Sequence, residues 1–157
     1  MKKILFVCFA NTCRSPLAQY IFNQQAASLG RTDLLAFSAG IEGDPKNSIS
    51  EKSEKVLRED YHINASKFKS SQFYPETADI YYQIIGMTFS ITQKVFGMME
   101  RERKPYNAKI DCIASFGEMK EVSDPYGDSV QEYRHAAQLI EKAVNDIIKA
   151  LPVEDAN

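Results

Sequence analysis

The stretch FVCFANTCRSPLAQY, residues 6–20, places two cysteines, an arginine and a serine at the end of an apolar run. The run itself, KILFVCF at residues 3–9, is typical of a strand that is buried on both faces of a parallel sheet. From Pro16 onward apolar residues recur at helical spacing, and Pro16 suits a first helical turn that Ser15 would cap. The stretch therefore predicts a strand, a tight loop and a helix that ends near Leu29, where a glycine follows.

Further strands and helices are expected to alternate along the chain. The predicted strands are LLAFSAG (34–40), ADIYYQIIGM (78–87) and KIDCIASF (109–116), and the predicted helices are SEKSEKVLREDY (50–61), SITQKVFGMM (90–99) and residues 130–151. Such alternation favours a parallel sheet covered by helices. We therefore predict one α/β domain over residues 1–157, with a four-stranded parallel sheet flanked by helices on both faces and a phosphate-binding loop after the first strand. Ligands of such sheets bind beyond the carboxyl ends of the strands, where Cys8 is expected.

Composition narrows the classes of function. The chain has 157 residues, enough for one core, and its 19 basic and 21 acidic residues give a formal charge of −2 with no long segment of either sign. Nucleic acid is therefore not an expected partner. No apolar run approaches the roughly 18 residues that span a bilayer, so no membrane segment is expected either. Three cysteines, an odd number, argue against a disulfide framework and for a reducing cytoplasm. A monomer is the default expectation.

The loop between the first strand and the first helix has the residue types of a covalent phosphate site. Successive backbone N–H groups in such a loop, with the positive end of a helix dipole behind them, bind anions. Arg14 would complete the site with a planar fork that matches two phosphate oxygens. Thiols beside a cation at a helix N-terminus ionise at lower pH than free thiols, so Cys8 is expected to be a thiolate nucleophile, steadied by the Ser15 hydroxyl. No nucleotide-type phosphate loop occurs in the chain, and no cofactor is expected.

The order of strand, C-x5-R-S-P and amphipathic helix resembles the low-molecular-weight protein tyrosine phosphatases. Their signature also has an asparagine three residues after the cysteine, where Asn11 stands. The resemblance implies a fold of the kind predicted above and a loop that binds inorganic phosphate or other oxyanions. The implied phosphate-binding and supporting residues of this loop and of the next strand are Phe9, Ala10, Asn11, Thr12, Cys13, Ser15 and Ser38.

A second part of the resemblance lies far downstream, in EVSDPYGDS at residues 121–129. In the family an aspartate immediately before proline is the general acid, and an aromatic residue after the proline lines the pocket. These roles carry over to Asp124 and Tyr126. Protonating a phenolate leaving group typically contributes about 10² to 10⁴-fold in rate. Taken alone, D-P-Y-G is an ordinary turn sequence.

Two smaller matches concern the support of the loop. The SAG segment at residues 38–40 resembles a family segment in which the serine helps the loop asparagine keep its strained shape, a role implied for Ser38 and Asn11. The family often uses a second loop cysteine as a reversible disulfide partner of the nucleophile, which makes Cys13 either a redox partner or a packing residue.

The chain also departs from the family pattern. Ala10 replaces a glycine, which strains the loop if that position needs a positive φ and costs nothing if it only needs a small side chain. The segment IEGDPKNS (41–48) lacks the aromatic that commonly walls the phosphotyrosine slot, and Phe9 is the expected replacement. SKFKSSQF (66–73) replaces a histidine and an ARQ run, and Thr88 replaces an aspartate, which predicts a weaker supporting network.

The leading hypothesis is a metal-free enzyme that hydrolyses phosphotyrosine in proteins through a phosphocysteine intermediate. His62 and His135 lack ligand spacing to the cysteines, so no metal site is expected. A thiol-dependent arsenate reductase on the same fold is an alternative, but it needs further cysteines, and only Cys112 remains, in an apolar strand. A non-catalytic phosphate-binding module is a third possibility. Ala10 favours the module, whereas the presence of Asp124 argues against it.

Overall fold

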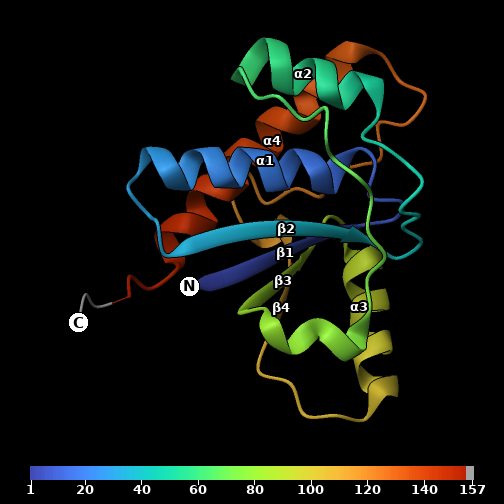
Figure 1. Ribbon diagram of the computed structural model, residues 1–157, viewed down its shortest axis with the longest axis vertical. Helices are drawn as coiled ribbons and strands as arrows, with labels where there is room; N and C mark the ends of the chain where they lie inside the picture. The colour runs from blue at the N-terminus through green and yellow to red at the C-terminus, as the bar shows by residue number, and fades with distance from the viewer. Residues whose placement is uncertain (155–157) are drawn as a thin grey trace.

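The computed structural model describes residues 1–154 and has a four-stranded sheet with all strands parallel, in the order β2-β1-β3-β4 (Figure 1). The strands are β1 (Lys2–Cys8), β2 (Leu34–Gly40), β3 (Gln83–Gly86) and β4 (Lys109–Cys112). The α-helices are α1 (Arg14–Ser28), α2 (Glu51–Tyr61), α3 (Phe89–Glu102) and α4 (Val130–Ala150). The predicted α/β fold class is confirmed.

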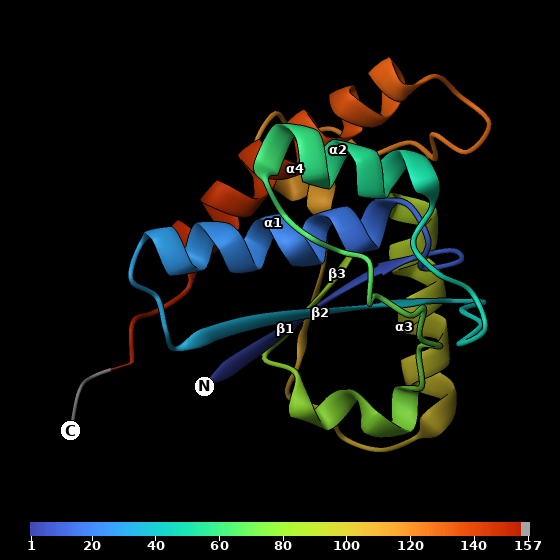
Figure 2. The ribbon, with the colours of Figure 1, turned by 45° about the horizontal axis from the view of Figure 1, so that its top comes forward.

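Helices cover both faces of the sheet. Helices α1, α2 and α4 lie together on one face, and α3 lies on the other with a 3₁₀ helix, Pro75–Ile80 (Figures 1 and 2). The central strand β1 supplies both cores in alternation: Ile4 and Phe6 are buried toward α1 and α4, whereas Leu5 and Val7 are buried toward α3. The continuous apolar run of β1 follows from this burial on both sides.

Three predicted boundaries were wrong. The first part of the predicted strand 78–87 lies largely in the 3₁₀ helix, and only Gln83–Gly86 pairs as β3. The predicted strand 109–116 ends at Cys112, where a short 3₁₀ helix begins. The third correction concerns Ser15, which does not cap the first helix. Cys13 is the N-cap residue and Ser15 lies inside the first turn. The Ser15 hydroxyl contacts the side chains of Cys8 and Asn11 and does not cap the helix.

The loop after β1 lies at the carboxyl end of the sheet, tightly against the end of β2. Gly40 pairs with Cys8, and a Cβ placed on Gly40 would lie 2.6 Å from the carbonyl oxygen of Phe9. Because real Cβ atoms do not approach backbone this closely, only glycine allows the loop to take this path. Within residues 1–154, no helix has the length and apolarity needed to cross a membrane.

Candidate active site

The loop between β1 and α1 lines a pocket of about 580 Å³ together with segments that are remote in the sequence. The residues that line it are Cys8, Phe9, Ala10, Thr12, Cys13, Arg14, Asn47, Asp124 and Tyr126. The structure therefore brings the predicted nucleophile, arginine and general acid to one cavity. Helix α1 begins behind this loop without a side-chain cap, so its first N–H groups have no side-chain acceptor. Such amides are available to an anion.

Cys8 lies in a buried chain of hydrogen bonds. Its Sγ is 2.9 Å from the Ser15 Oγ, and the Asn11 side-chain amide donates to that same Oγ at 2.8 Å. The Ser15 hydroxyl has two possible acceptors, the Cys8 Sγ at 2.9 Å and the Ala39 carbonyl at 3.4 Å, and the sulfur is the nearer of the two. A hydroxyl that donates to sulfur stabilises the thiolate relative to the thiol.

Asn11 has a left-handed backbone, with a φ of 58°, and three contacts hold it there. Its side-chain oxygen accepts from the Ser71 N–H at 2.8 Å, and its carbonyl accepts from the Ser70 hydroxyl at 2.7 Å. The third contact is the bond to Ser15. Asparagine tolerates this conformation better than most residues, so these bonds fix the turn of the loop.

The predicted contact between Ser38 and Asn11 was wrong. The Ser38 hydroxyl donates to the Gln19 side chain at 2.6 Å, so it ties β2 to α1. Ser70 and Ser71 hold Asn11 in its place. Both belong to the segment 66–73, from which a weaker network was predicted, and the structure shows direct bonds from that segment to the loop.

Ala10 has no strained backbone. The non-glycine residues with positive φ within residues 1–154 are Asn11, His62, Arg103 and Met119. The position of Ala10 therefore does not need a positive φ, which leaves the alternative that it needs only a small side chain.

Arg14 connects the loop to residues 121–129, the Asp-Pro segment that contains Asp124. It is only 5% exposed, and its Nη1 donates to the Val122 carbonyl at 3.2 Å. Its Nη2 lies 3.8 Å from the Asp124 Oδ2, a loose ion pair, and the Asp124 Oδ1 accepts from the Tyr126 N–H at 3.1 Å. The carboxylate thus stays about half exposed beside the pocket, while the buried guanidinium keeps donors for an anion.

Cys13 is held by the other helices of the same face. Its Sγ lies 3.4 Å from the Tyr133 hydroxyl of α4, and its carbonyl accepts from the Ser53 hydroxyl of α2 at 3.1 Å. Burial, followed by the hydrogen bond to Cys13, raises the pKa of Tyr133 above its ordinary value. Cys8 and Cys13 are both free thiols, and their redox pairing stays a prediction.

Asn47, Ser70, Ser71 and Tyr133 belong to the site, and the sequence pattern did not single them out. Each comes from a loop or helix that is placed only by tertiary contacts. For Asn47 these contacts include a bond from the Ser70 N–H to the Asn47 carbonyl and the pairing of Ser48 with Lys69. Neither contact leaves a spacing signal in the sequence.

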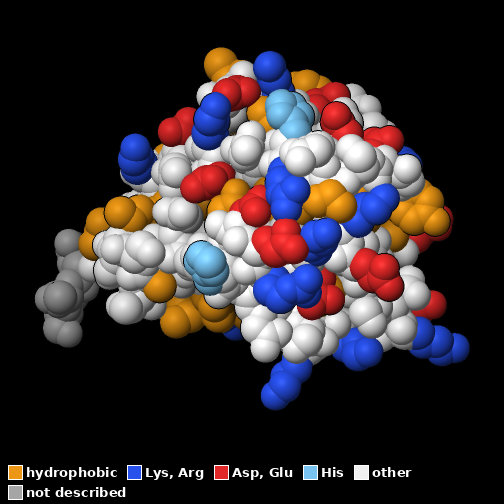
Figure 3. Space-filling view, turned by 90° about the horizontal axis from the view of Figure 1, so that it is seen from above, with side chains coloured by type: hydrophobic (Ala, Val, Ile, Leu, Met, Phe, Trp, Pro, Cys, Tyr) orange, Lys and Arg blue, Asp and Glu red, His pale blue; other side chains and the backbone are white. Residues whose placement is uncertain are grey.

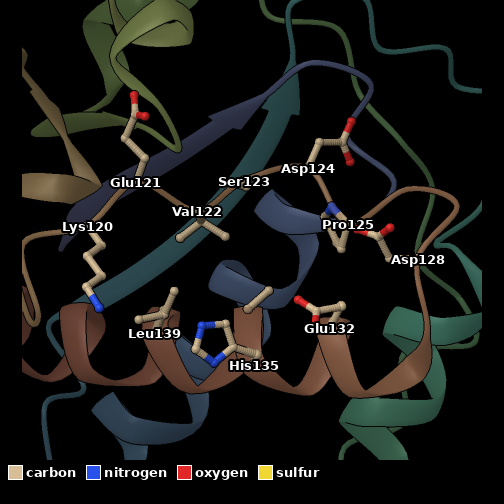
Figure 4. A pocket seen from close by; sticks show the side chains of 11 residues that line it. Lys120, Glu121, Val122, Ser123, Asp124, Pro125, Asp128, Glu132, His135 and Leu139 are labelled. Atoms are coloured by element: carbon tan, nitrogen blue, oxygen red, sulfur yellow. The ribbon is translucent and has the colours of Figure 1, made fainter.

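A second cavity, of about 270 Å³, lies between the Asp-Pro segment and α4. His135, Leu139 and Glu132 project into it from α4, whereas the Asp124 carboxylate points away from it, toward the loop after β1 (Figure 4). Asp124 therefore stands between the two cavities and presents its carboxylate to the one that contains Cys8. Among residues 1–154, no cluster of three or more His, Cys, Asp or Glu side chains is suited to a metal ion.

Comparisons with known proteins identify the class. The family model of low molecular weight phosphotyrosine protein phosphatases matches residues 3–157. PtpB of Staphylococcus epidermidis, a low molecular weight protein-tyrosine-phosphatase, is 30% identical, over 92% of this chain and 96% of that protein. The protein-arginine-phosphatase of Bacillus subtilis is 29% identical, over 94% of this chain and 95% of its own length.

A solved structure agrees with both comparisons. The low molecular weight protein tyrosine phosphatase of T. tengcongensis superimposes with a TM-score of 0.87 at 30% identity, covering 96% of this chain and 100% of that one. Fold and sequence together define a cysteine-based phosphatase. The chain belongs to the low molecular weight phosphotyrosine protein phosphatase family.

Proposed function

We propose that this protein hydrolyses phosphotyrosine in protein substrates through a phosphocysteine intermediate. The observation that carries the proposal is the placing of Cys8, Arg14 and Asp124 on one pocket, with the Cys8 Sγ 2.9 Å from a hydroxyl that receives a second hydrogen bond. A nucleophile, an anion clamp and a proton donor are the three parts that covalent phosphoryl transfer requires.

In the first step the Cys8 thiolate attacks phosphorus in line, so that a P–S bond forms as the bond to the tyrosine oxygen breaks. Arg14 and the loop amides hold the nonbridging oxygens, and Asp124 gives its proton to the leaving phenolate. In the second step Asp124 takes a proton from water, and the water oxygen attacks phosphorus. The P–S bond breaks, inorganic phosphate leaves, and the thiolate is restored beside Ser15.

The pocket walls support an aromatic substrate. Phe9 and Tyr126 line the pocket and are 41% and 80% exposed, so their rings are accessible to a phosphotyrosine side chain. Offset and edge-to-face contacts between aromatic rings add about 0.5–1.5 kcal/mol per pair beyond the area buried. Phe9 fits the role expected for it as one wall of the slot.

Phosphoarginine is a second candidate substrate. One relative is named a protein-arginine-phosphatase, and Asn47 and Thr12 give part of the pocket wall polar side chains. A guanidinium group can form hydrogen bonds with such side chains, which a phenol ring cannot match. Direct comparison of the two phosphorylated side chains in one peptide sequence separates the candidates.

Two further alternatives are less well supported. An arsenate reductase would need another cysteine near the pocket, but Cys112 is buried in β4 and does not line the pocket. The non-catalytic module was favoured by Ala10, which strains the loop if its position needs a positive φ. Ala10 has no positive φ, so this argument for the module is weakened. All three cysteines are free, as is typical of proteins in the reducing cytoplasm, and this supports a cytoplasmic location. We also propose that the protein is a monomer.

The decisive experiment measures para-nitrophenyl phosphate hydrolysis with a chelator present, for the wild type, Cys8→Ser and Asp124→Asn, between pH 4 and 8. We expect turnover in the wild type, none above background in Cys8→Ser, and a loss of about 10² to 10⁴-fold in Asp124→Asn. The same enzymes are then given a phosphotyrosine peptide and its phosphoarginine counterpart. Phosphate binding without turnover by the wild type would contradict the proposal and favour the module. Faster hydrolysis of phosphoarginine would reassign the substrate.

A further inference from the structure

Lys94 of α3 places a positive charge beside Phe9, a residue that lines the catalytic pocket, although Lys94 does not line the pocket itself. Its Nζ lies 5.7 Å from the ring centroid of Phe9, and Phe9 lines the pocket that contains Cys8. Lysine 94 itself is exposed. Ammonium groups within about 6 Å of an aromatic centroid are attracted to the ring face, so the lysine has a preferred position over Phe9.

The charge of Lys94 is not neutralised inside the protein. Among residues 1–154, no carboxylate oxygen lies within 4.0 Å of its Nζ, and the Nζ donates no hydrogen bond to a described residue. Lys52 offers a contrast, because it also stands over a ring, that of Tyr133, but donates to the Asp128 carbonyl. Lys94 therefore keeps its ammonium donors for a group outside the chain.

The position of Lys94 differs from that of the acidic groups near the site. Asp124 and Asp128 precede α4, and the exposed Glu42 follows β2 with its N–H bonded to the Phe9 carbonyl. Lys94 belongs to α3, on the opposite face of the sheet from α4 (Figure 1). The face over α2 and α4 mixes acidic and basic side chains closely (Figure 3), and the formal charge of the whole chain is only −2. Attraction of a charged peptide by the protein as a whole is therefore weak. A local charge such as that of Lys94 then has the larger effect on which peptide binds.

We infer that Lys94 is a specificity-determining residue that favours phosphotyrosine sites with an Asp or Glu within two positions of the phosphotyrosine. The inference rests on the proposed function. An extended peptide advances about 3.3 Å per residue, so the side chains of adjacent positions pass over the pocket mouth when the phosphate group is inside. An acidic side chain on the α3 side then reaches the ammonium group, whereas a basic one is repelled by it.

The test uses phosphotyrosine peptides that differ only in having Glu, Gln or Lys at one of the positions from −2 to +2. For each enzyme, the ratio of kcat/KM for the Glu peptide to that for the Gln peptide is measured at low and at high salt. This ratio cancels any general change in catalysis. The enzymes are the wild type, Lys94→Met, Lys94→Glu and the control Lys104→Met, whose lysine lies beyond the other end of α3 and pairs with Glu102.

We expect a wild-type ratio of about 2 to 5 at one or more positions at low salt, the range typical of an exposed ion pair. High salt should reduce it. The ratio should fall to about 1 in Lys94→Met, while Lys94→Glu should prefer the Lys peptide and Lys104→Met should match the wild type. A ratio of 1 in the wild type, or the same ratio in Lys94→Met, would overturn the inference although the peptides are hydrolysed. If para-nitrophenyl phosphate is hydrolysed but no peptide is, the proposed substrate itself fails, and the inference with it.

Discussion

At the scale of single residues, Asn11 determines the shape of the loop more than its neighbours do. It alone among residues 8–15 has a positive φ, and it connects Ser15, next to the proposed nucleophile Cys8, with Ser71 of a remote segment. Ala10, the departure from the family pattern, is an ordinary residue in this structure. The position that departs from the pattern is therefore not the one under strain.

The first prediction compares Asn11→Ala with Ala10→Gly. Asn11→Ala removes two side-chain hydrogen bonds and places alanine in a left-handed conformation, which costs roughly 1–2 kcal/mol. It also leaves the Ser71 N–H without its acceptor. We expect kcat for para-nitrophenyl phosphate to fall at least about tenfold in this variant, because Ser15 loses its orientation. Ala10→Gly, the control, should stay within about twofold of the wild type. Equal losses in both variants would show that the loop responds to any change.

At the scale of secondary structure, the end of β2 determines the path of the catalytic loop. The N–H groups of Ile41 and Glu42 donate to the carbonyls of Cys8 and Phe9, at 3.0 and 2.8 Å. Gly40 makes this approach possible, since its missing side chain leaves room for the backbone of the loop. The strand thus supports the loop through main-chain bonds that do not depend on the side chains of the loop.

The second prediction follows from that approach. Gly40→Ala puts a Cβ 2.6 Å from the Phe9 oxygen and 2.9 Å from the Ala10 carbonyl carbon, so the loop or the strand must shift. We expect a large loss of kcat/KM and a lower free energy of unfolding, measured by urea denaturation. The matched control is Gly97→Ala in α3, where the added Cβ lies 3.5 Å from the end of the Arg101 side chain. Helix propensity there favours alanine by up to about 1 kcal/mol. Normal activity in Gly40→Ala would contradict the tight packing.

At the scale of the whole molecule, Arg31 ties the chain between α1 and β2 to the end of α4. Its guanidinium forms two 2.9 Å bonds with the Asp33 carboxylate and also donates to the carbonyls of Ile148, Leu151 and Pro152. Arg31 therefore binds carbonyls in the last turn of α4 and just beyond it, where backbone acceptors lack the regular partners of a helix interior. The bonds of Arg31 thus link the chain that follows α1 with the end of α4, on the same face of the sheet.

The third prediction concerns the pH dependence of this tie. The hydrogen bonds from Arg31, the largest cause, hold the pKa of Asp33 well below its ordinary value of 3.8 in the folded state. A lowered folded pKa contributes stability that is fully present above the unfolded pKa, near pH 4, and is lost as the pH falls below it. We expect Asp33→Asn to reduce the free energy of unfolding at pH 7 and the difference from the wild type to narrow between pH 4 and pH 3.

The control for this prediction is Glu54→Gln, which breaks the exposed pair with Arg58 on α2. An exposed pair within one helix contributes only about 0.3–0.5 kcal/mol, so this variant should stay close to the wild type at pH 7. Urea denaturation at each pH measures all three proteins. A constant difference between the wild type and Asp33→Asn from pH 7 to pH 3 would contradict the assigned pKa direction.

The fold and part of the candidate site could be predicted from the sequence alone. The apolar run of β1, the order C-x5-R-S-P and the alternation of strands with helices predicted the α/β fold and the loop, because local patterns depend on period and spacing. Asp124 was also predicted from the sequence, since a proline follows it in a motif that resembles the family's, and it lines the same pocket as Cys8. Where motifs are short and contiguous, the chemistry they encode can be read without coordinates.

The tertiary structure decided what supports and surrounds that chemistry. Ser70 and Ser71 rather than Ser38 hold Asn11, Asn47 lines the pocket, Tyr133 contacts Cys13, and Lys94 stands over Phe9. Each of these contacts joins segments that are distant along the chain, and a hydrogen bond or ring contact of this kind leaves no periodic signal in either segment. Only the folding of helices and connecting segments around the sheet brings these side chains to the loop, so their roles depend on the folded arrangement and not on local sequence.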